Sequence, residues 1–104
     1  MEDRNQRMDN YNSLGHLVTS QCQAGFERAI LRAELDEDWA DLNLTCVMPG
    51  NEPIEADIRG IVMADIHEYL DGIREEMARQ TGHRWNSCVF TVEADGHFKL
   101  DVQY

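Results

Sequence analysis

The sequence predicts an α+β domain, in which a four-stranded antiparallel sheet (order α-β-β-α-β-β) carries two helices on one face. Apolar and polar residues alternate in 87–93 and again in 98–104, which is typical of strands with one buried face. Apolar residues recur every three or four positions in 58–79, which is typical of a helix. A helix-like segment and two strand-like segments precede them. One sheet with both helices on the same side buries all of these apolar faces.

The first element is expected to be a helix that follows a frayed start at residues 1–8. Asp9 or Asn10 is a suitable N-cap, and Gly25 is placed to end the helix. The apolar positions repeat at helical spacing and define one buried face. They are Tyr11, Leu14, Leu17, Val18 and Cys22.

Two strands should follow the first helix and pair as a hairpin. Residues 26–35 and 42–48 alternate between apolar and polar, and the acidic turn 36–41 separates them. Proline, glycine and asparagine at 49–51 supply turn chemistry after the second strand. Residues 52–57, which include a proline, are expected to be a polar connector.

The second helix should begin near Ile58, end near Arg79 and be capped by Gly82. Gly60 and Gly72 fall inside it and should each cost about 1 kcal/mol relative to alanine. The apolar face comprises Ile58, Ile61, Val62, Ile66, Tyr69, Leu70, Ile73 and Met77.

The final hairpin turns at Asp95-Gly96, a pair that suits a type I′ turn because both central residues need positive φ. A lone hairpin is marginal in water, so this one must lie on a larger sheet or against helices. Phe98→Ala should then cost about 3–5 kcal/mol, the cost of emptying a core aromatic site. The residues expected to face the helices are Phe90, Phe98, Leu100 and Tyr104.

The composition limits which partners and which cellular location are expected. The 104 residues favour a single domain, 1–104, and the formal net charge is -11. A strongly acidic chain disfavours nucleic acid and anionic membrane surfaces as partners and favours a basic protein. No apolar run approaches a membrane span, and the polar start has no signal-peptide pattern, so a cytoplasmic location is the default expectation.

Cysteine and histidine do not form a recognisable site. Cys22, Cys46 and Cys88 are odd in number and widely spaced, so we expect three buried free thiols without a disulfide framework or zinc site. The pairing of Cys88 with His83 stays open as a catalytic pair, although Cys88 lies on the presumed core face. No phosphate loop, nucleophile elbow or metal-ligand spacing occurs, so no cofactor or catalytic residue is predicted.

Acidic residues are the better-organised feature. One cluster surrounds Trp39 in the first hairpin, which is either an interface anchor or a side chain folded onto the core edge. A second stripe runs along the second helix, where an ordinary solvated face is the alternative. Together the two regions fit a surface for a cationic partner. The candidate partner-binding residues are Glu34, Asp36, Glu37, Asp38, Trp39, Asp41, Asp65, Glu68, Asp71 and Glu75.

The final hairpin resembles the C-terminal signature of the YezG-like immunity proteins, and the similarity extends from about Asp9 onward. The signature consists of a tryptophan, a strand, an Asp-Gly turn and spaced aromatic residues. It stands here as Trp85, Phe90, Asp95, Gly96, Phe98, Asp101 and Tyr104. Family members often continue past the final tyrosine, where this sequence stops.

The resemblance implies a cytoplasmic antitoxin that neutralises a toxin domain, in many cases a nuclease, without turnover. An acidic inhibitor suits the basic surface with which a nuclease binds phosphates. The family supplies no binding residues to transfer, so the interface prediction rests on charge. Two alternatives remain from the sequence: an acidic adaptor or secretion chaperone, and a small enzyme with an unrecognised carboxylate or cysteine site.

Overall fold

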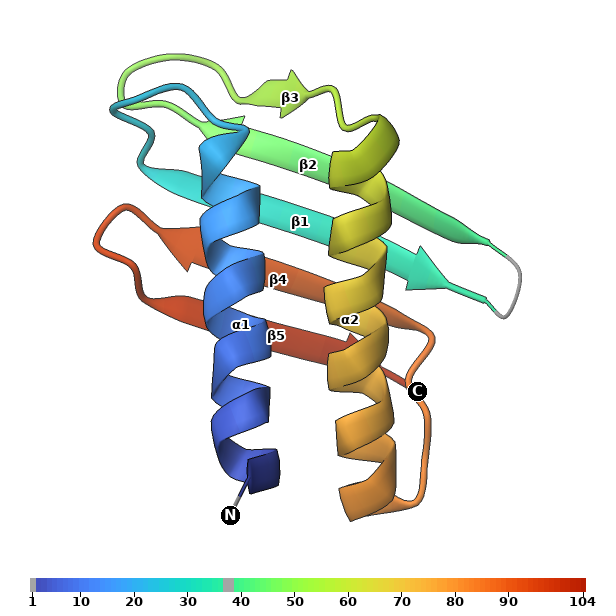
Figure 1. The fold of residues 1–104 in the computed structure, drawn as a ribbon. Coiled ribbons are helices and arrows are strands. Elements are labelled where there is room, and N and C mark those ends of the chain that lie inside the picture. Colours follow the sequence, from blue (N-terminus) through green and yellow to red (C-terminus); the bar gives the residue numbers. More distant parts are fainter. Residues whose placement is uncertain (1, 37–38) are drawn as a thin grey trace.

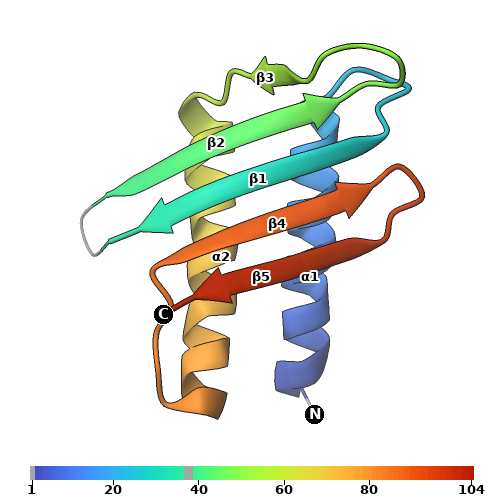
Figure 2. The ribbon, with the colours of Figure 1, turned by 180° about the vertical axis from the view of Figure 1, so that it is seen from behind.

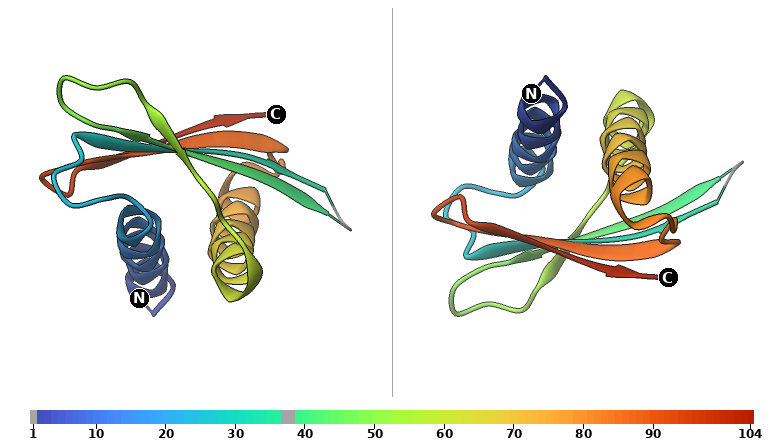
Figure 3. Two further views of the ribbon diagram at one scale, coloured as in Figure 1. Left: turned by 90° about the horizontal axis from the view of Figure 1, so that it is seen from above. Right: turned by 90° about the horizontal axis from the view of Figure 1, so that it is seen from below.

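Two antiparallel helices lie side by side on one face of an antiparallel sheet (Figures 1 and 3). The computed structural model describes residues 2–36 and 39–104. This arrangement confirms the α+β class and the placement of both helices on one face. The elements are α1 (Glu2–Ser20), β1 (Arg28–Leu35), β2 (Ala40–Val47), β3 (Ile54–Ala56), α2 (Gly60–Thr81), β4 (Ser87–Glu93) and β5 (Phe98–Gln103).

The sheet has five strands in the order β3-β2-β1-β4-β5, so the prediction of four strands was wrong. The additional strand, β3, lies in the expected connector and, within the described part of the chain, pairs with β2 alone, at Leu44, Thr45 and Cys46. Three residues are too few to show a period of two. Pro53 precedes β3, where proline is compatible with an edge strand. The predicted hairpin of β1 and β2 and the final hairpin of β4 and β5 are both present.

Both helices begin at residues other than those predicted, and α1 also ends earlier than predicted. α1 begins at Glu2, within the segment expected to be frayed, and ends at Ser20, five residues before Gly25. α2 begins at Gly60, whose φ of 59° is accessible to glycine, so this residue starts the helix and is not an interior cost. Gly82 ends α2 in the left-handed conformation and donates its N–H to the Ala78 carbonyl at 2.8 Å. Within the described residues, no helix has the length and apolarity needed to cross a bilayer.

The core lies between the helices and the central strands. Leu31 of β1 sits opposite Leu44 on one side and Phe90 on the other, and all three side chains are buried. The two helices approach closely at Gly72, where an added Cβ would lie 3.3 Å from the side-chain amide nitrogen (Nδ2) of Asn10. Helix positions that complete the core are Leu14, Val18, Ile66, Leu70 and Ile73, and the loop before β4 adds Trp85.

The edge strand β5 is less covered than predicted. Phe90 is fully buried as expected, but Phe98 is 37% exposed and Tyr104 is 63% exposed. Phe98 nevertheless faces the helices, because its ring stacks on Tyr11 of α1 at 5.3 Å and lies 5.7 Å from Phe90. Phe98 is therefore an edge residue, so we now expect Phe98→Ala to cost less than emptying a fully buried aromatic site.

The turn between β4 and β5 is not type I′. Among the described residues only glycines have positive φ, so Asp95 does not take the required conformation. Gly96, at φ 95°, donates its N–H to Glu93, and the Glu93 N–H donates to His97. This is a three-residue loop, a type I turn followed by a left-handed glycine. Asp95 accepts hydrogen bonds from the backbone and ring of His97, which lower the pKa of its carboxyl.

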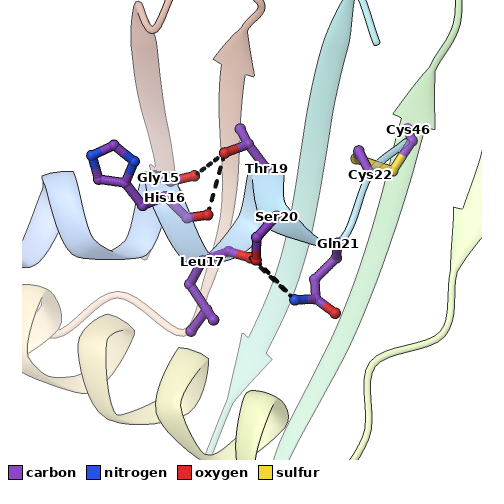
Figure 4. The surroundings of a disulfide bond; sticks show 8 residues. All are labelled: Gly15, His16, Leu17, Thr19, Ser20, Gln21, Cys22 and Cys46. Carbon is purple, nitrogen blue, oxygen red and sulfur yellow. Dashed lines mark hydrogen bonds between the residues drawn. A yellow bond between two sulfur atoms is a disulfide. The ribbon is translucent and has the colours of Figure 1, made fainter. Parts of the chain in front are cut away.

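A disulfide joins Cys22 to Cys46, so the expectation of three free thiols was wrong for this pair (Figure 4). It ties the loop after α1 to β2, across a Cα–Cα distance of 5.7 Å. The last turn of α1 carries hydroxyls that bond back to helix carbonyls, with Thr19 donating to Gly15 at 2.9 Å. Cys22 lies two residues after the end of α1 and meets Cys46 on the face of the sheet that the helices cover.

Candidate protein-binding surface

Figure 2 views the sheet from the side away from the helices. Most residues whose side chains point to this face are polar. On β1, positions 29, 31, 33 and 35 are buried, so the alternate positions point to the open face. The register places Glu34 opposite Asp41 of β2, and Arg32 opposite both Asn43 of β2 and Val89 of β4. This face is therefore built from five strands, and its central neighbours, β1 and β4, are distant in sequence.

A hollow of about 570 Å³ opens on this face beside the β1–β2 hairpin. Four carboxylates from four different strands line it, whereas Arg32 is the one basic side chain in the lining. The carboxylates belong to Glu34, Asp41, Glu55 and Asp101. We call this feature the acidic hollow.

The arrangement inside the acidic hollow favours a cation. Glu34 and Asp41 are directly opposite in an antiparallel pair, where like charges destabilise the ladder. Arg32 occupies the next row and forms no ion pair with any described residue. A positive group from a partner, placed between Glu34 and Asp41, would relieve their repulsion.

A second hollow of about 420 Å³ lies on the same face, toward the turn between β4 and β5. It shares Arg32 and Asp101 with the acidic hollow. Its charges are largely paired, since Arg28 bonds Glu93 at 2.9 Å and Lys99 lies 3.6 Å from Asp101. The open face is thus acidic at one end and mixed in charge at the other.

The β1–β2 hairpin extends beyond the helix layer and carries part of the predicted cluster (Figures 1 and 2). Asp36 is exposed and donates its backbone N–H to the Trp39 carbonyl at 2.9 Å. Trp39 is 50% exposed, which favours an available anchor over a side chain folded onto the core. Glu37 and Asp38, also predicted partner-binding residues, lie outside the described residues.

The predicted helix stripe lies on the other side of the domain. Glu68 and Asp71 are exposed on α2, while Ile66 and Leu70 of the same helix are buried against the sheet. Asp65 and Glu75 are partly buried, and Glu75 pairs with Arg84 at 2.6 Å. The structure therefore does not join the stripe and the hairpin cluster on one surface.

Two acidic residues of the hollow were missed in the sequence. Asp101 stands on the polar side of the last strand, a position that the alternation had already shown. Glu55 belongs to β3, which the sequence predicts as a connector, and it faces the hollow because it pairs with Thr45 of β2. The strand order places both residues in the same lining as Glu34 and Asp41. Strand order cannot be read from a local sequence pattern.

The catalytic alternatives gain no support from the geometry of the described residues. Burial raises the pKa of the Cys88 thiol to about 12, so the group is a neutral thiol at physiological pH and a poor nucleophile. His83, its suggested partner, is exposed beside Tyr104. Within residues 2–36 and 39–104, no three His, Cys, Asp or Glu side chains come together as a metal site.

Comparison with protein-family models and with curated proteins found no match for this chain. The likeness to YezG-like immunity proteins therefore stays a prediction from the sequence. In the structure, Trp85 and Phe90 of that signature are core residues, and Asp95 and Gly96 form the turn. Asp101 is the member of the signature that also lines the acidic hollow.

Proposed function

We propose that this protein is a cytoplasmic immunity protein that binds and neutralises a cognate toxin domain with a basic surface, such as a nuclease. The observation that carries the proposal is the acidic hollow, whose lining on the open face includes four carboxylates and one basic side chain, with Glu34 and Asp41 directly opposite each other. A nuclease presents lysines and arginines for phosphate contacts, and those groups are the ones that this hollow fits. The inhibitor acts by stoichiometric binding, without cofactor or turnover.

Electrostatics sets the expected behaviour of the complex. A net charge of -11 speeds the encounter with a basic partner, and salt slows it because the Debye length is about 10 Å at 0.1 M ionic strength. Trp39, half exposed at the hairpin, lies next to the strand that bears Asp41 and is placed to act as an apolar anchor.

The test is to express the chain with the toxin-type product of an adjacent gene and to titrate the toxin's activity. We expect loss of activity at near-equal stoichiometry. Reversing Glu34 and Asp41 to lysine should weaken binding strongly, and Trp39→Ala should weaken it separately. The matched control is reversal of Glu68 and Asp71 on α2. Both double variants change the net charge by the same amount, so a difference between them reports the site and not the total charge.

Three outcomes would overturn parts of the proposal. Equal weakening by both double variants would mean that the hollow is not the interface. A bound partner that keeps its full activity would identify the chain as an acidic adaptor or secretion chaperone. Turnover of a small molecule, with no protein bound, would replace inhibition with catalysis.

A further inference from the structure

The outer edge of β5 carries unused backbone groups. His97 accepts the Glu93 N–H through its carbonyl, so His97 and the alternate residues after it point toward β4. The backbone groups of Phe98, Leu100 and Val102 then point away from the sheet. Among the described residues, β5 pairs with β4 alone. This edge is six residues long, whereas β3 at the opposite edge has three.

The helix-facing side of β5 is also incompletely covered. Leu31 and Phe90 are fully buried, but Leu100, which follows them in the same row, is only partly buried. Val102 is likewise partly buried, and Phe98 is 37% exposed. The apolar layer therefore thins at the edge strand.

Both helices continue past this edge. Figures 1 and 2 show that the first turns of α1 and the last turns of α2 project beyond β5. Tyr11 of α1 stacks on Phe98 of the edge strand, so residues 2–10 of the helix lie beyond that contact. A strand added beside β5 would lie beneath these helix ends.

The charges on β5 define what such a strand should contain. Lys99 and Asp101 point to the open face, where they lie 3.6 Å apart, and their neighbours in β4 are the uncharged Thr91 and Val89. An antiparallel strand would place an acid opposite Lys99 and a base opposite Asp101. Apolar residues would face Phe98, Leu100 and Val102. The matching pattern is apolar, basic, apolar, acidic, apolar.

A second copy of this chain has the same pattern in residues 98–102, but the helix layer excludes it. Antiparallel pairing of two β5 strands requires a two-fold axis perpendicular to the sheet, which keeps the helices of both copies on one face. The projecting helix ends of each copy would then collide with those of the other. A single extended segment has no helix layer and meets no such obstacle.

We propose that β5 is a strand-addition site that takes an extended segment of a partner protein, with the pattern apolar-basic-apolar-acidic-apolar, as a sixth antiparallel strand. The backbone supplies the hydrogen bonds, and Lys99 and Asp101 select the segment. This site lies at the sheet edge and shares Asp101 with the acidic hollow, but it does not depend on the proposed inhibition.

The probe is a synthetic peptide, SVKLEVS, which places lysine opposite Asp101 and glutamate opposite Lys99. The amide resonances of Phe98, Leu100 and Val102 should shift saturably in NMR titrations that reach millimolar peptide. The charge-exchanged peptide SVELKVS should bind roughly tenfold more weakly, because two opposite-charge pairs become like-charge pairs. The double variant Lys99→Glu with Asp101→Lys should reverse that preference.

Backbone methylation provides the matched control. N-methylation of the peptide's leucine removes an N–H that bonds to β5 and should abolish binding. N-methylation of its glutamate removes an N–H that points away from β5, so this change should be tolerated. Reversal of Glu34 and Asp41 should leave peptide binding unchanged, which separates this test from that of the proposed function. Absence of saturable shifts at the β5 amides, equal effects of the two methylations, or a dimer paired through β5 would overturn the proposal.

Discussion

Glu34 and Asp41 stand directly opposite each other in the ladder between β1 and β2, with both carboxylates on the open face of the sheet. Like charges at such a position oppose folding. The sheet would be more stable with a neutral residue at either place. Retaining both acids is costly for the isolated protein and useful for a protein that receives a cation there.

The first prediction follows from that pair. Asp41→Asn should raise the free energy of unfolding by about 0.2–1 kcal/mol, because it removes a cross-strand repulsion. Urea denaturation at low salt measures the gain, and about 1 M salt should shrink it by screening. The control is Glu93→Gln, which removes an acid that is paired with Arg28 at 2.9 Å and should give no gain. A loss of stability in Asp41→Asn would show that the carboxylate is held by favourable contacts.

The second prediction concerns Arg74, whose side chain is 10% exposed on the inner side of α2. Its Nε has no hydrogen-bond partner among the described residues, and the nearest carboxylate, Asp71, is 4.0 Å from the guanidinium. A desolvated charge with so weak a partner contributes little stability. Arg74→Met should leave the free energy of unfolding unchanged or raise it by up to several kcal/mol, about 1 kcal/mol being a typical gain.

Chemical denaturation measures the effect of Arg74→Met, with Arg79→Met as the control. Arg79 is exposed and pairs with Glu76, so its replacement should change stability by about 0.5 kcal/mol or less. A marked loss in Arg74→Met alone would mean that the guanidinium holds a structural contact which packing cannot replace.

The third prediction compares two aromatic residues of the final hairpin. Phe90→Ala should cost about 3–5 kcal/mol, because the ring is fully buried between the sheet and the helices. Phe98→Ala should cost clearly less, since Phe98 is 37% exposed at the edge and loses mainly its stacking on Tyr11. Thermal and urea unfolding of both variants test the order. Equal losses would show that the edge is covered in solution.

Local patterns in the sequence predicted most of the fold. Both hairpins and α2 have long, regular repeats, and most of their apolar positions became the core, whereas Ile61, Phe98 and Tyr104 are exposed. The pairing of β1 with β4 was not predictable in this way, because Arg28 and Glu93 are 65 residues apart and the alternation does not state which strands are neighbours. β3 was not predicted because a strand of three residues is too short to show the alternation of apolar and polar side chains.

The candidate surface was predictable only in part for the same reason. The cluster around Trp39 is contiguous in sequence, so Glu34 and Asp41 were found there. Glu55 and Asp101 join them through the strand order β3-β2-β1-β4-β5, which the sequence does not display. The stripe at Glu68 and Asp71 was assigned to the same surface because a helical repeat shows which side is polar but not where that side faces.

The last prediction concerns the disulfide between Cys22 and Cys46, which closes a loop with a sequence separation of 24. In the chain-entropy model, closing a loop of this length stabilises the folded state by about 3.5 kcal/mol. The double variant Cys22→Ser with Cys46→Ser should lose a comparable free energy relative to the oxidised protein in urea denaturation. Thiol titration of the unfolded oxidised chain should find Cys88 alone.

The same bond bears on where the protein works, because disulfides persist in oxidising compartments and cytoplasmic thiols are kept reduced. A cytoplasmic protein must therefore fold as the dithiol. We expect protein that is alkylated immediately on lysis to carry three blocked cysteines and the reduced chain to remain folded, with a lower melting temperature. Recovery of the disulfide from freshly alkylated cells, or unfolding on reduction, would contradict a cytoplasmic location and place the protein in an oxidising environment.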